Sequence, residues 1–174
     1  MVEWSSWFLV SDGEASVIYV LKNEPSPSAF CDILDYGVGK CGFAILVIQP
    51  LNRMSPDGVA VLKTLEPYLA EKKVTNKWPG HKMSAGNALV HKYKYEEPFA
   101  RAIQDINDHL YGWLQPNFPE DICLLRENGE PWFVSIVHEK DSYFSLPEEE
   151  KNALIQKVPE LGRILMKDKG EHVN

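Results

Sequence analysis

The residues whose types suggest chemistry lie close together near position 140. His138, Glu139 and Asp141 place an imidazole and two carboxylates within four positions of the chain. Such groups act as general acids and bases or bind metal ions. Adjacent residues of a strand point to opposite faces, so His138 and Glu139 converge only if a strand ends between them. With Arg126, these two residues define a candidate pocket for a small molecule or for a hydrolytic reaction.

Other motifs give little support for a cofactor or a metal. Residues Gly37–Gly42 match the pattern G-x-G-x-x-G, but a helix-like segment precedes them and the apolar run Phe43–Ile48 follows. A dinucleotide site needs the opposite order, strand and then helix. The three cysteines, Cys31, Cys41 and Cys123, match no zinc spacing, and we expect reduced and mostly buried thiols. We therefore predict no cofactor and no metal site, and a non-catalytic protein rather than an enzyme.

Acidic side chains gather in the same part of the sequence and suggest a binding function. Residues 96–150 contain 13 acidic and three basic side chains, whereas residues 61–95 contain seven basic and two acidic ones. An acidic field attracts a basic protein and disfavours nucleic acid. Tryptophan is favoured at binding hot spots, so Trp132 is a candidate anchor. The predicted partner-binding residues are Asp105, Asp108, Glu120, Asp121, Glu127, Glu130 and Trp132.

Length and composition suit one soluble domain. The 174 residues are 44% hydrophobic and 25% charged, with a net charge of −7. These shares are close to those of globular proteins, so disorder is not expected over most of the chain. No apolar run approaches the roughly 20 residues that span a bilayer, and the N-terminus lacks the pattern of a signal peptide. We expect a cytoplasmic protein without a membrane or nucleic-acid partner, and leave the oligomeric state open.

Asn128-Gly129 marks the clearest hairpin, because this dipeptide favours a tight turn and lies between two apolar runs. Asp12-Gly13 marks a second hairpin in the same way. The predicted strands are Trp7–Val10, Ala15–Leu21, Phe43–Ile48, Ala88–Tyr95, Ile122–Leu125, Trp132–His138 and Tyr143–Leu146.

Helices are predicted between these strands from capping residues and apolar spacing. Ser55-Pro56-Asp57 is a strong helix start, and Pro67 should kink or end that helix before its pattern finishes at Leu69. The other predicted helices are Ser28–Tyr36, a long one from Pro98 whose apolar stripe reaches Leu114, one from Pro147 to about Lys157, and a short turn over Leu161–Met166. Residues from Thr75 to Gly86 are predicted to form a loop, and a charged tail begins at about residue 167. This order of elements predicts a single α+β domain over residues 1–174, with a mostly antiparallel sheet and three to four helices.

One segment resembles known proteins. Pro119–Leu146, with the sequence PEDICLLRENGEPWFVSIVHEKDSYFSL, resembles a group of small acidic bacterial α+β proteins that share a Pro-Glu-Asp strand entry, a glycine turn, an aromatic strand and a His-Glu ending. Similar proteins occur as immunity proteins of bacterial toxin systems. The resemblance implies a fold and a class of partner, and it carries over no catalytic residue.

Three hypotheses follow from these observations. The first is a non-catalytic cytoplasmic binding protein, such as an immunity protein that neutralises a basic toxin domain by occluding its active site. The alternative is a small-molecule-binding protein or hydrolytic enzyme with a pocket near His138. A self-associating structural protein is a third possibility.

Overall fold

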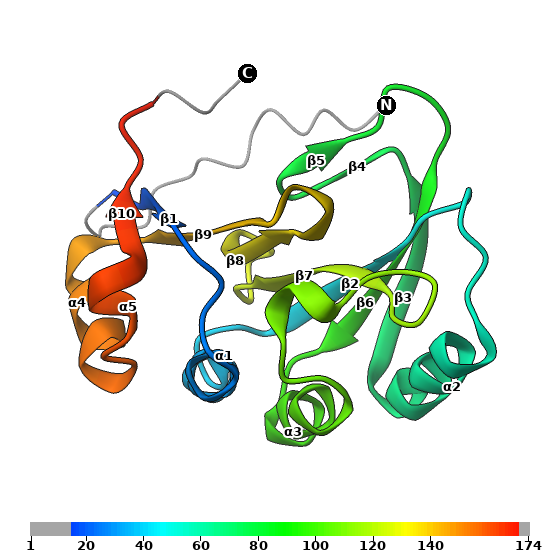
Figure 1. The fold of residues 1–174 in the computed structure, drawn as a ribbon, viewed down its shortest axis with the longest axis horizontal. Helices are drawn as coiled ribbons and strands as arrows, with labels where there is room; N and C mark the ends of the chain where they lie inside the picture. The colour runs from blue at the N-terminus through cyan, green and yellow to red at the C-terminus, as the bar shows by residue number, and fades with distance from the viewer. Residues whose placement is uncertain (1–14, 171–174) are drawn as a thin grey trace.

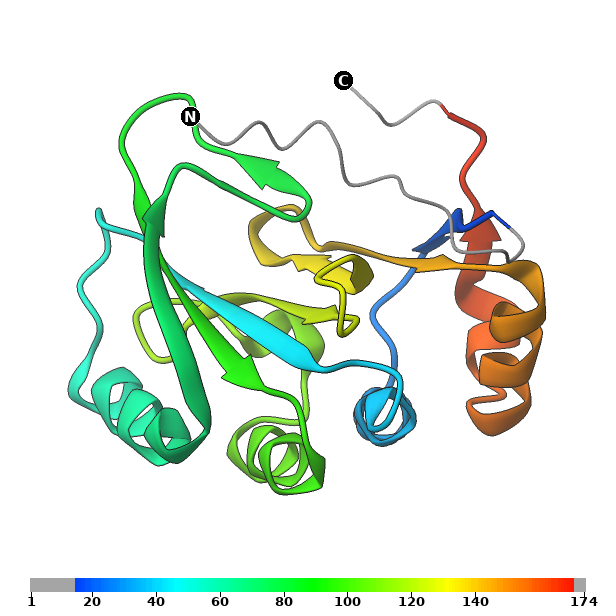
Figure 2. The same cartoon turned by 180° about the vertical axis from the view of Figure 1, so that it is seen from behind.

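An eight-stranded antiparallel sheet runs through the protein, which the computed structural model describes over residues 15–170 (Figures 1 and 2). The strand order is β10-β1-β9-β8-β7-β2-β6-β3, and every neighbouring pair is antiparallel. The prediction of a largely antiparallel α+β fold is therefore confirmed. The strands are β1 (Val17–Leu21), β2 (Phe43–Ile48), β3 (Leu69–Thr75), β6 (Ala88–Lys94), β7 (Glu120–Leu125), β8 (Pro131–Ile136), β9 (Asp141–Leu146) and β10 (Leu165–Lys167).

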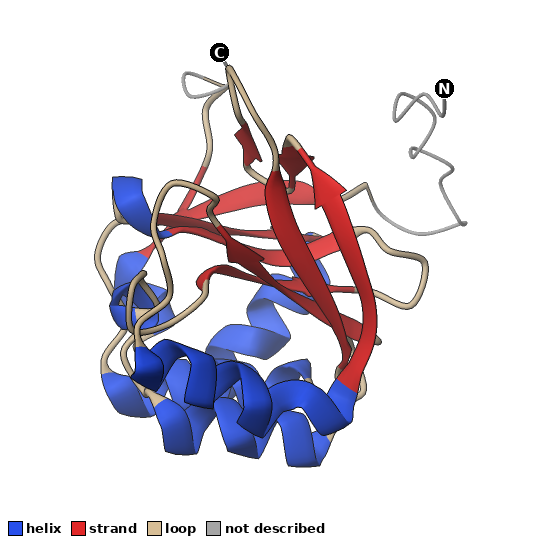
Figure 3. Cartoon of the chain, turned by 90° about the vertical axis from the view of Figure 1, so that its right-hand side faces the viewer, coloured by secondary structure: helices blue, strands red, loops and turns tan. Residues whose placement is uncertain are grey.

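The helices cover one face of this sheet, as Figure 3 shows. They are α1 (Pro27–Gly37), α2 (Pro56–Leu65), α3 (Glu97–Ile106), α4 (Glu148–Lys157) and the short α5 (Leu161–Ile164), with 3-10 turns η2 (Glu66–Tyr68), η3 (Leu110–Gly112) and η4 (Val137–Glu139). On the other face lies a small hairpin of β4 (Lys77–Trp78) and β5 (His81–Lys82). None of the helices in the described range is long and apolar enough to span a membrane.

Two of the predicted helices form as their sequences indicate. In α1 the apolar residues Phe30, Ile33 and Leu34 are fully buried. In α2 the Ser55 hydroxyl accepts the backbone N–H of Gly58 at 3.1 Å, which satisfies one of the free amides of the first turn. The helix ends at Leu65, so Pro67 shortens it as expected.

Each face of the sheet has its own apolar core. The larger core fills the space between the sheet and the helices and includes Phe30, Phe99 and Trp132. The smaller core lies under the β4–β5 hairpin and includes Trp78 and Val134. The hairpin therefore belongs to the packed structure and does not form a free loop.

The Asn128-Gly129 hairpin supplies two central strands of the sheet, as predicted. Gly129 has a φ of +86°, and the backbone N–H of Arg126 donates to the Glu130 carbonyl at 2.8 Å across the turn. Strand β9 adds the expected third strand beside β8. Strand β2 lies on the other side of β7, so this hairpin holds the middle of the sheet together.

The predicted loop and helix around residues 66–86 were partly wrong. Residues Leu69–Thr75 form β3 at the edge of the sheet, although the apolar spacing of the preceding helix had extended to Leu69. Pairing with β6 provides backbone partners that local spacing does not reveal. Within the predicted loop, Trp78 pairs with His81 to form the β4–β5 hairpin.

The helix that begins near Pro98 is shorter than predicted. Its apolar stripe continues to Leu114, but α3 ends at Ile106, and Asn107 is extended with a φ of −163°. The Asn107 side-chain oxygen accepts the backbone N–H of His109 at 3.1 Å, a local bond that competes with helix continuation. Trp113 still reaches the core because the chain turns back there, and its indole N–H donates to the Asn107 carbonyl at 3.0 Å.

Strands β1 and β10, near the two ends of the described range, pair with each other at one side of the sheet. The predicted strand Ala15–Leu21 forms as β1, whereas Trp7–Val10 and the Asp12-Gly13 turn lie outside the described residues. Helix α4 forms as predicted, but the helical turn expected over Leu161–Met166 divides into α5 and β10. Pairing of β10 with β1 extends the sheet up to Lys167, where the charged tail was predicted to begin.

Candidate functional site

A buried polar network lies where β7 begins and η4 follows β8. The Glu120 side chain is fully buried, and its Oε2 lies 2.9 Å from Nε2 of His138. Its Oε1 accepts the backbone N–H of Gln115 at 3.1 Å. The His138 side chain is 54% exposed, so a buried carboxylate orients an imidazole that reaches solvent.

Burial is the main influence on the Glu120 carboxyl and raises its pKa. The Gln115 N–H and the His138 ring oppose this effect, because both stabilise the charged form. The result is a carboxyl group that takes up a proton more readily than an exposed glutamate. Such a group beside an imidazole suits proton transfer, and it equally suits a structural role that satisfies buried donors.

Asp121 ties the hairpin β4–β5 to the same network. The residue is almost fully buried and adopts a left-handed backbone with a φ of +54°. Its carboxylate accepts the indole N–H of Trp78 and the backbone N–H of Val137, both at 2.9 Å. Glu120 and Asp121 thus fix three segments that are distant in sequence.

Glu120, Asp121 and Trp132, which were predicted to contact a partner, do not lie on the surface of the folded protein. All three are buried, and each polar group already has an internal partner. The Trp132 indole N–H donates to Glu150 at 2.9 Å, and its ring packs in the larger core. Glu120 and Asp121 begin β7, all six residues of which are buried, and Trp132 belongs to the neighbouring strand β8.

The alternative pocket of Arg126, His138 and Glu139 does not form as predicted. Arg126 lies at the β7–β8 turn and pairs with Glu150 at 2.7 Å, whereas His138 lies beyond the opposite end of both strands. The strand does end before His138, since η4 begins at Val137, and Glu139 is exposed. The partner that the structure gives to His138 is Glu120.

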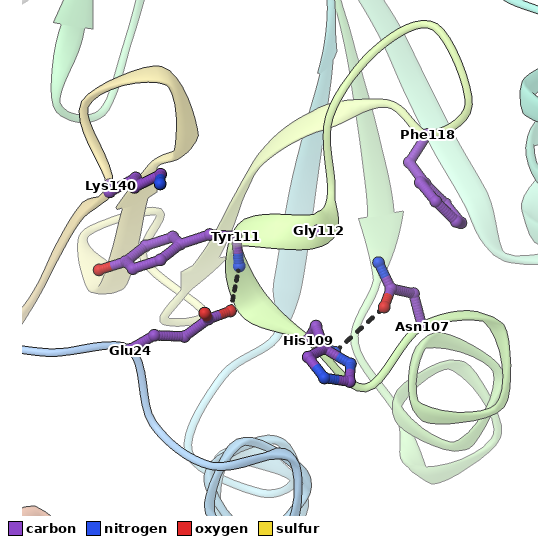
Figure 4. Close-up of a pocket in the computed structure, with 7 residues that line it drawn as sticks. All are labelled: Glu24, Asn107, His109, Tyr111, Gly112, Phe118 and Lys140. Carbon is purple, nitrogen blue, oxygen red and sulfur yellow. Dashed lines mark hydrogen bonds between the residues drawn. The ribbon is translucent and has the colours of Figure 1, made fainter.

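An open pocket of about 480 Å³ has η3 in its wall, and η3 contacts η4, the turn that carries His138 (Figure 4). Phe118 and Lys140, each two positions from a member of the Glu120–His138 pair, contribute to its wall. The Tyr111 backbone N–H donates to Glu24 at 2.8 Å, and its hydroxyl lies 2.9 Å from the Ser142 hydroxyl. The residues that line the pocket are Glu24, Asn107, His109, Tyr111, Gly112, Phe118 and Lys140.

Four aspartates meet on the helix layer, and we call them the acidic surface: Asp32 and Asp35 of α1, with Asp105 of α3 and Asp108 just after it. Helices α1 and α3 are in contact, and Gln104 donates to Asp35 at 2.6 Å between them. Burial, and then the charges of all four aspartates, raises the pKa of the half-buried Cys31 thiol, so each of the four carboxylates is near enough to act on this one residue. The structure thus brings the predicted Asp105 and Asp108 together with two aspartates that sequence reasoning missed.

Glu127 and Glu130 lie apart from these aspartates along the chain, at the β7–β8 turn, where they are exposed and half-exposed. Their role in binding stays a prediction. Within the described range, no group of three or more histidine, cysteine or acidic side chains could hold a metal ion.

Comparison of the chain with protein-family models, with curated protein sequences and with solved structures found no match.

A sequence signal for the Glu120–His138 pair was present in the hairpin. Counting outward from Asn128-Gly129 pairs Cys123 with Val134, and the same register places Glu120 near the end of β8 beside η4. The acidic surface left a weaker signal, because Asp32 and Asp35 lie about 70 positions from Asp105. Their meeting depends on how α1 and α3 pack.

Proposed function

We propose that this protein is a non-catalytic binding protein whose acidic surface docks a basic protein domain. The observation that carries the proposal is that two packed helices contribute four aspartates to one solvent-facing patch. Within residues 15–170, none of the four forms an ion pair with lysine or arginine, and the one ion pair among them joins Asp108 to His109 at 2.7 Å. Complementary charge speeds association and favours the correct partner.

The partner class that fits best is a basic toxin domain, blocked by occlusion of its cationic active site. The resemblance of Pro119–Leu146 to immunity proteins supports this class, and so does the separation of charge along the sequence. A gene for a large toxin next to the gene for this protein would supply the candidate domain for co-purification.

The location of the docking face is tested with a fluorescein-labelled decalysine peptide as the cationic probe. In one variant, Asp32, Asp35, Asp105 and Asp108 are changed to Asn. In a matched control, the exposed or half-exposed Glu127, Glu130, Glu148 and Glu149 are changed to Gln, which removes the same number of charges. We expect the first variant to weaken binding about tenfold or more, a loss near 1.4 kcal/mol, and the control to weaken it less than twofold. Equal losses would show that net charge alone attracts the peptide, and the proposal would fail.

A second candidate function rests on the Glu120–His138 pair beside the pocket. A buried carboxylate that orients an exposed imidazole is the arrangement of a general base, so a hydrolytic enzyme is the alternative proposal. The test is hydrolysis of p-nitrophenyl acetate by the wild type, by His138→Ala and by the control His81→Ala. His81 is a suitable control because it is a half-exposed imidazole that does not line the pocket. A tenfold loss confined to His138→Ala supports the enzyme, and equal rates in all three rule it out.

A further inference from the structure

Lysines gather on the sheet face opposite the helices, near the β3 edge. Pairing register places Lys73 of β3 on the same face as Val90, and Lys92 and Lys94 follow Val90 at alternate positions of β6. Alternate residues of a strand share one face, and two residues span about 6.6 Å along it. The lysine surface consists of Lys73, Lys77, Lys82, Lys92 and Lys94.

Two lysines of this surface oppose each other directly. Lys77 of β4 is the cross-strand partner of Lys82 of β5, and both are exposed. Like charges in directly opposed positions destabilise a strand pair. Glu71 of β3 is the cross-strand partner of Lys92, but within the described part of the chain no carboxylate lies within ion-pair distance of Lys77, Lys82, Lys92 or Lys94. An anion bound between the two strands would relieve this repulsion.

Aromatic rings lie among these lysines. The Lys92 Nζ is 4.0 Å from the centroid of the half-exposed Phe43 ring, and the half-exposed His81 ring lies 4.8 Å from that of Trp78. Lysines that follow a backbone, with rings on which bases stack, are the features of single-strand binding surfaces. The large apolar side chains exposed within residues 15–170 are Leu51, Val59, Val74, Leu114 and Met166, and none belongs to β4, β5 or β6, the strands that carry Lys77, Lys82, Lys92 and Lys94.

We infer that the lysine surface binds single-stranded nucleic acid. The inference differs from the expectation, based on the acidic middle of the sequence, that nucleic acid is not a partner. The acidic surface belongs to the helix layer, on the other side of the sheet (Figure 3). Charges farther apart than the Debye length, about 8 Å at physiological salt, are largely screened, so the two faces act separately.

The test measures fluorescence polarisation of a labelled twelve-nucleotide oligothymidylate at several NaCl concentrations. Neutralisation of phosphates by Lys77, Lys82, Lys92 and Lys94 predicts a slope of log affinity against log salt of about −2.8, and about a 50-fold loss of affinity between 50 and 200 mM. The triple variant Lys77→Gln, Lys82→Gln and Lys92→Gln should bind at least tenfold more weakly, with a slope that approaches about −0.7.

The matched control changes Lys63, Lys157 and Lys169 to Gln, three exposed lysines outside the lysine surface. We expect its affinity to stay within twofold of the wild type, and the thermal midpoint of neither variant to fall below the wild-type value. Absence of oligonucleotide binding at 50 mM NaCl, or equal losses in both variants, would overturn the inference. It would also be overturned if oligoglutamate or phosphatidylserine vesicles bound as tightly as the oligonucleotide. The decalysine experiment involves other residues, so either proposal can fail without the other.

Discussion

His91 is a buried imidazole whose surroundings disfavour its protonated form. It is only 6% exposed, and its Nε2 has no hydrogen-bond partner in the described structure, while Nδ1 lies 3.1 Å from the Tyr93 hydroxyl. Burial first, and then the nearby Lys72, lowers the pKa of His91 from 6.5 to about 4. A protonated imidazole is therefore much less stable in the fold than in the unfolded chain.

This difference predicts a pH dependence of stability. Between pH 6.5 and about 4 the unfolded chain binds a proton that the folded protein does not, so the free energy of unfolding falls as pH falls, by about 3 kcal/mol in total. The double variant His91→Leu, Tyr93→Phe removes the titrating group without leaving the tyrosine hydroxyl unpaired. Urea unfolding from pH 4 to pH 7 should show a weaker loss in this variant. Identical pH profiles for the two proteins would contradict the assignment.

At the scale of elements, the β4–β5 hairpin covers part of the sheet face opposite the helices. Asp121 holds the Trp78 indole, and Gly80 turns the chain with a φ of +79° directly over the sheet. A Cβ added at Gly80 would lie 2.8 Å from Cγ1 of Val134 and 3.1 Å from Ile136. The hairpin therefore approaches β8 more closely than a side chain at this position would allow.

Gly80→Ala should consequently lower the free energy of unfolding by about 2–4 kcal/mol, from backbone strain and overpacking together. The control is Gly86→Ala, in the same segment, with a φ of +76° and no atom within 4 Å of the added Cβ. That variant carries the backbone strain alone and should lose about 1 kcal/mol. Chemical denaturation measures both values. If Gly86→Ala is as destabilising as Gly80→Ala, contact with β8 is not the cause.

At the scale of the molecule, the short strand β10 forms one edge of the sheet and covers the outer side of β1. Strand β10 pairs with β1 through Tyr19–Lys167 and two further positions, and the Asp168 N–H donates to Ile18 at 2.9 Å. Without β10, the backbone groups of β1 would form an open edge, which is prone to pairing with another chain.

Truncation after Ile164 should lower the thermal midpoint by about 4–8 °C, if three paired residues contribute about 2 kcal/mol. It should also produce concentration-dependent association in sedimentation velocity experiments. Truncation after Gly170 keeps β10 and is the control, with an expected midpoint close to that of the full chain. Association of both proteins to the same extent would show that the β1 edge is not responsible.

The sequence by itself determined the elements that depend on local physics. Capping by Ser55, the stop at Pro67 and the turn at Asn128-Gly129 act within a few residues, so they are readable from neighbours in the chain. The antiparallel α+β class followed from the order of these elements. The register of this hairpin also places Glu120, at the start of β7, close to His138, which follows the end of β8.

Only the tertiary structure decided which charged residues reach solvent and which charges meet. Nothing in the sequence distinguishes Glu120 and Asp121 from the other acidic residues. They are buried because β7 is a central strand with apolar cores on both faces, and their carboxylates accept hydrogen bonds inside the protein. Asp32 and Asp35 joined Asp105 and Asp108 because α1 packs on α3. The strand β3 and the early end of α3 likewise depended on distant pairing and on a local side-chain bond, which apolar spacing alone does not encode.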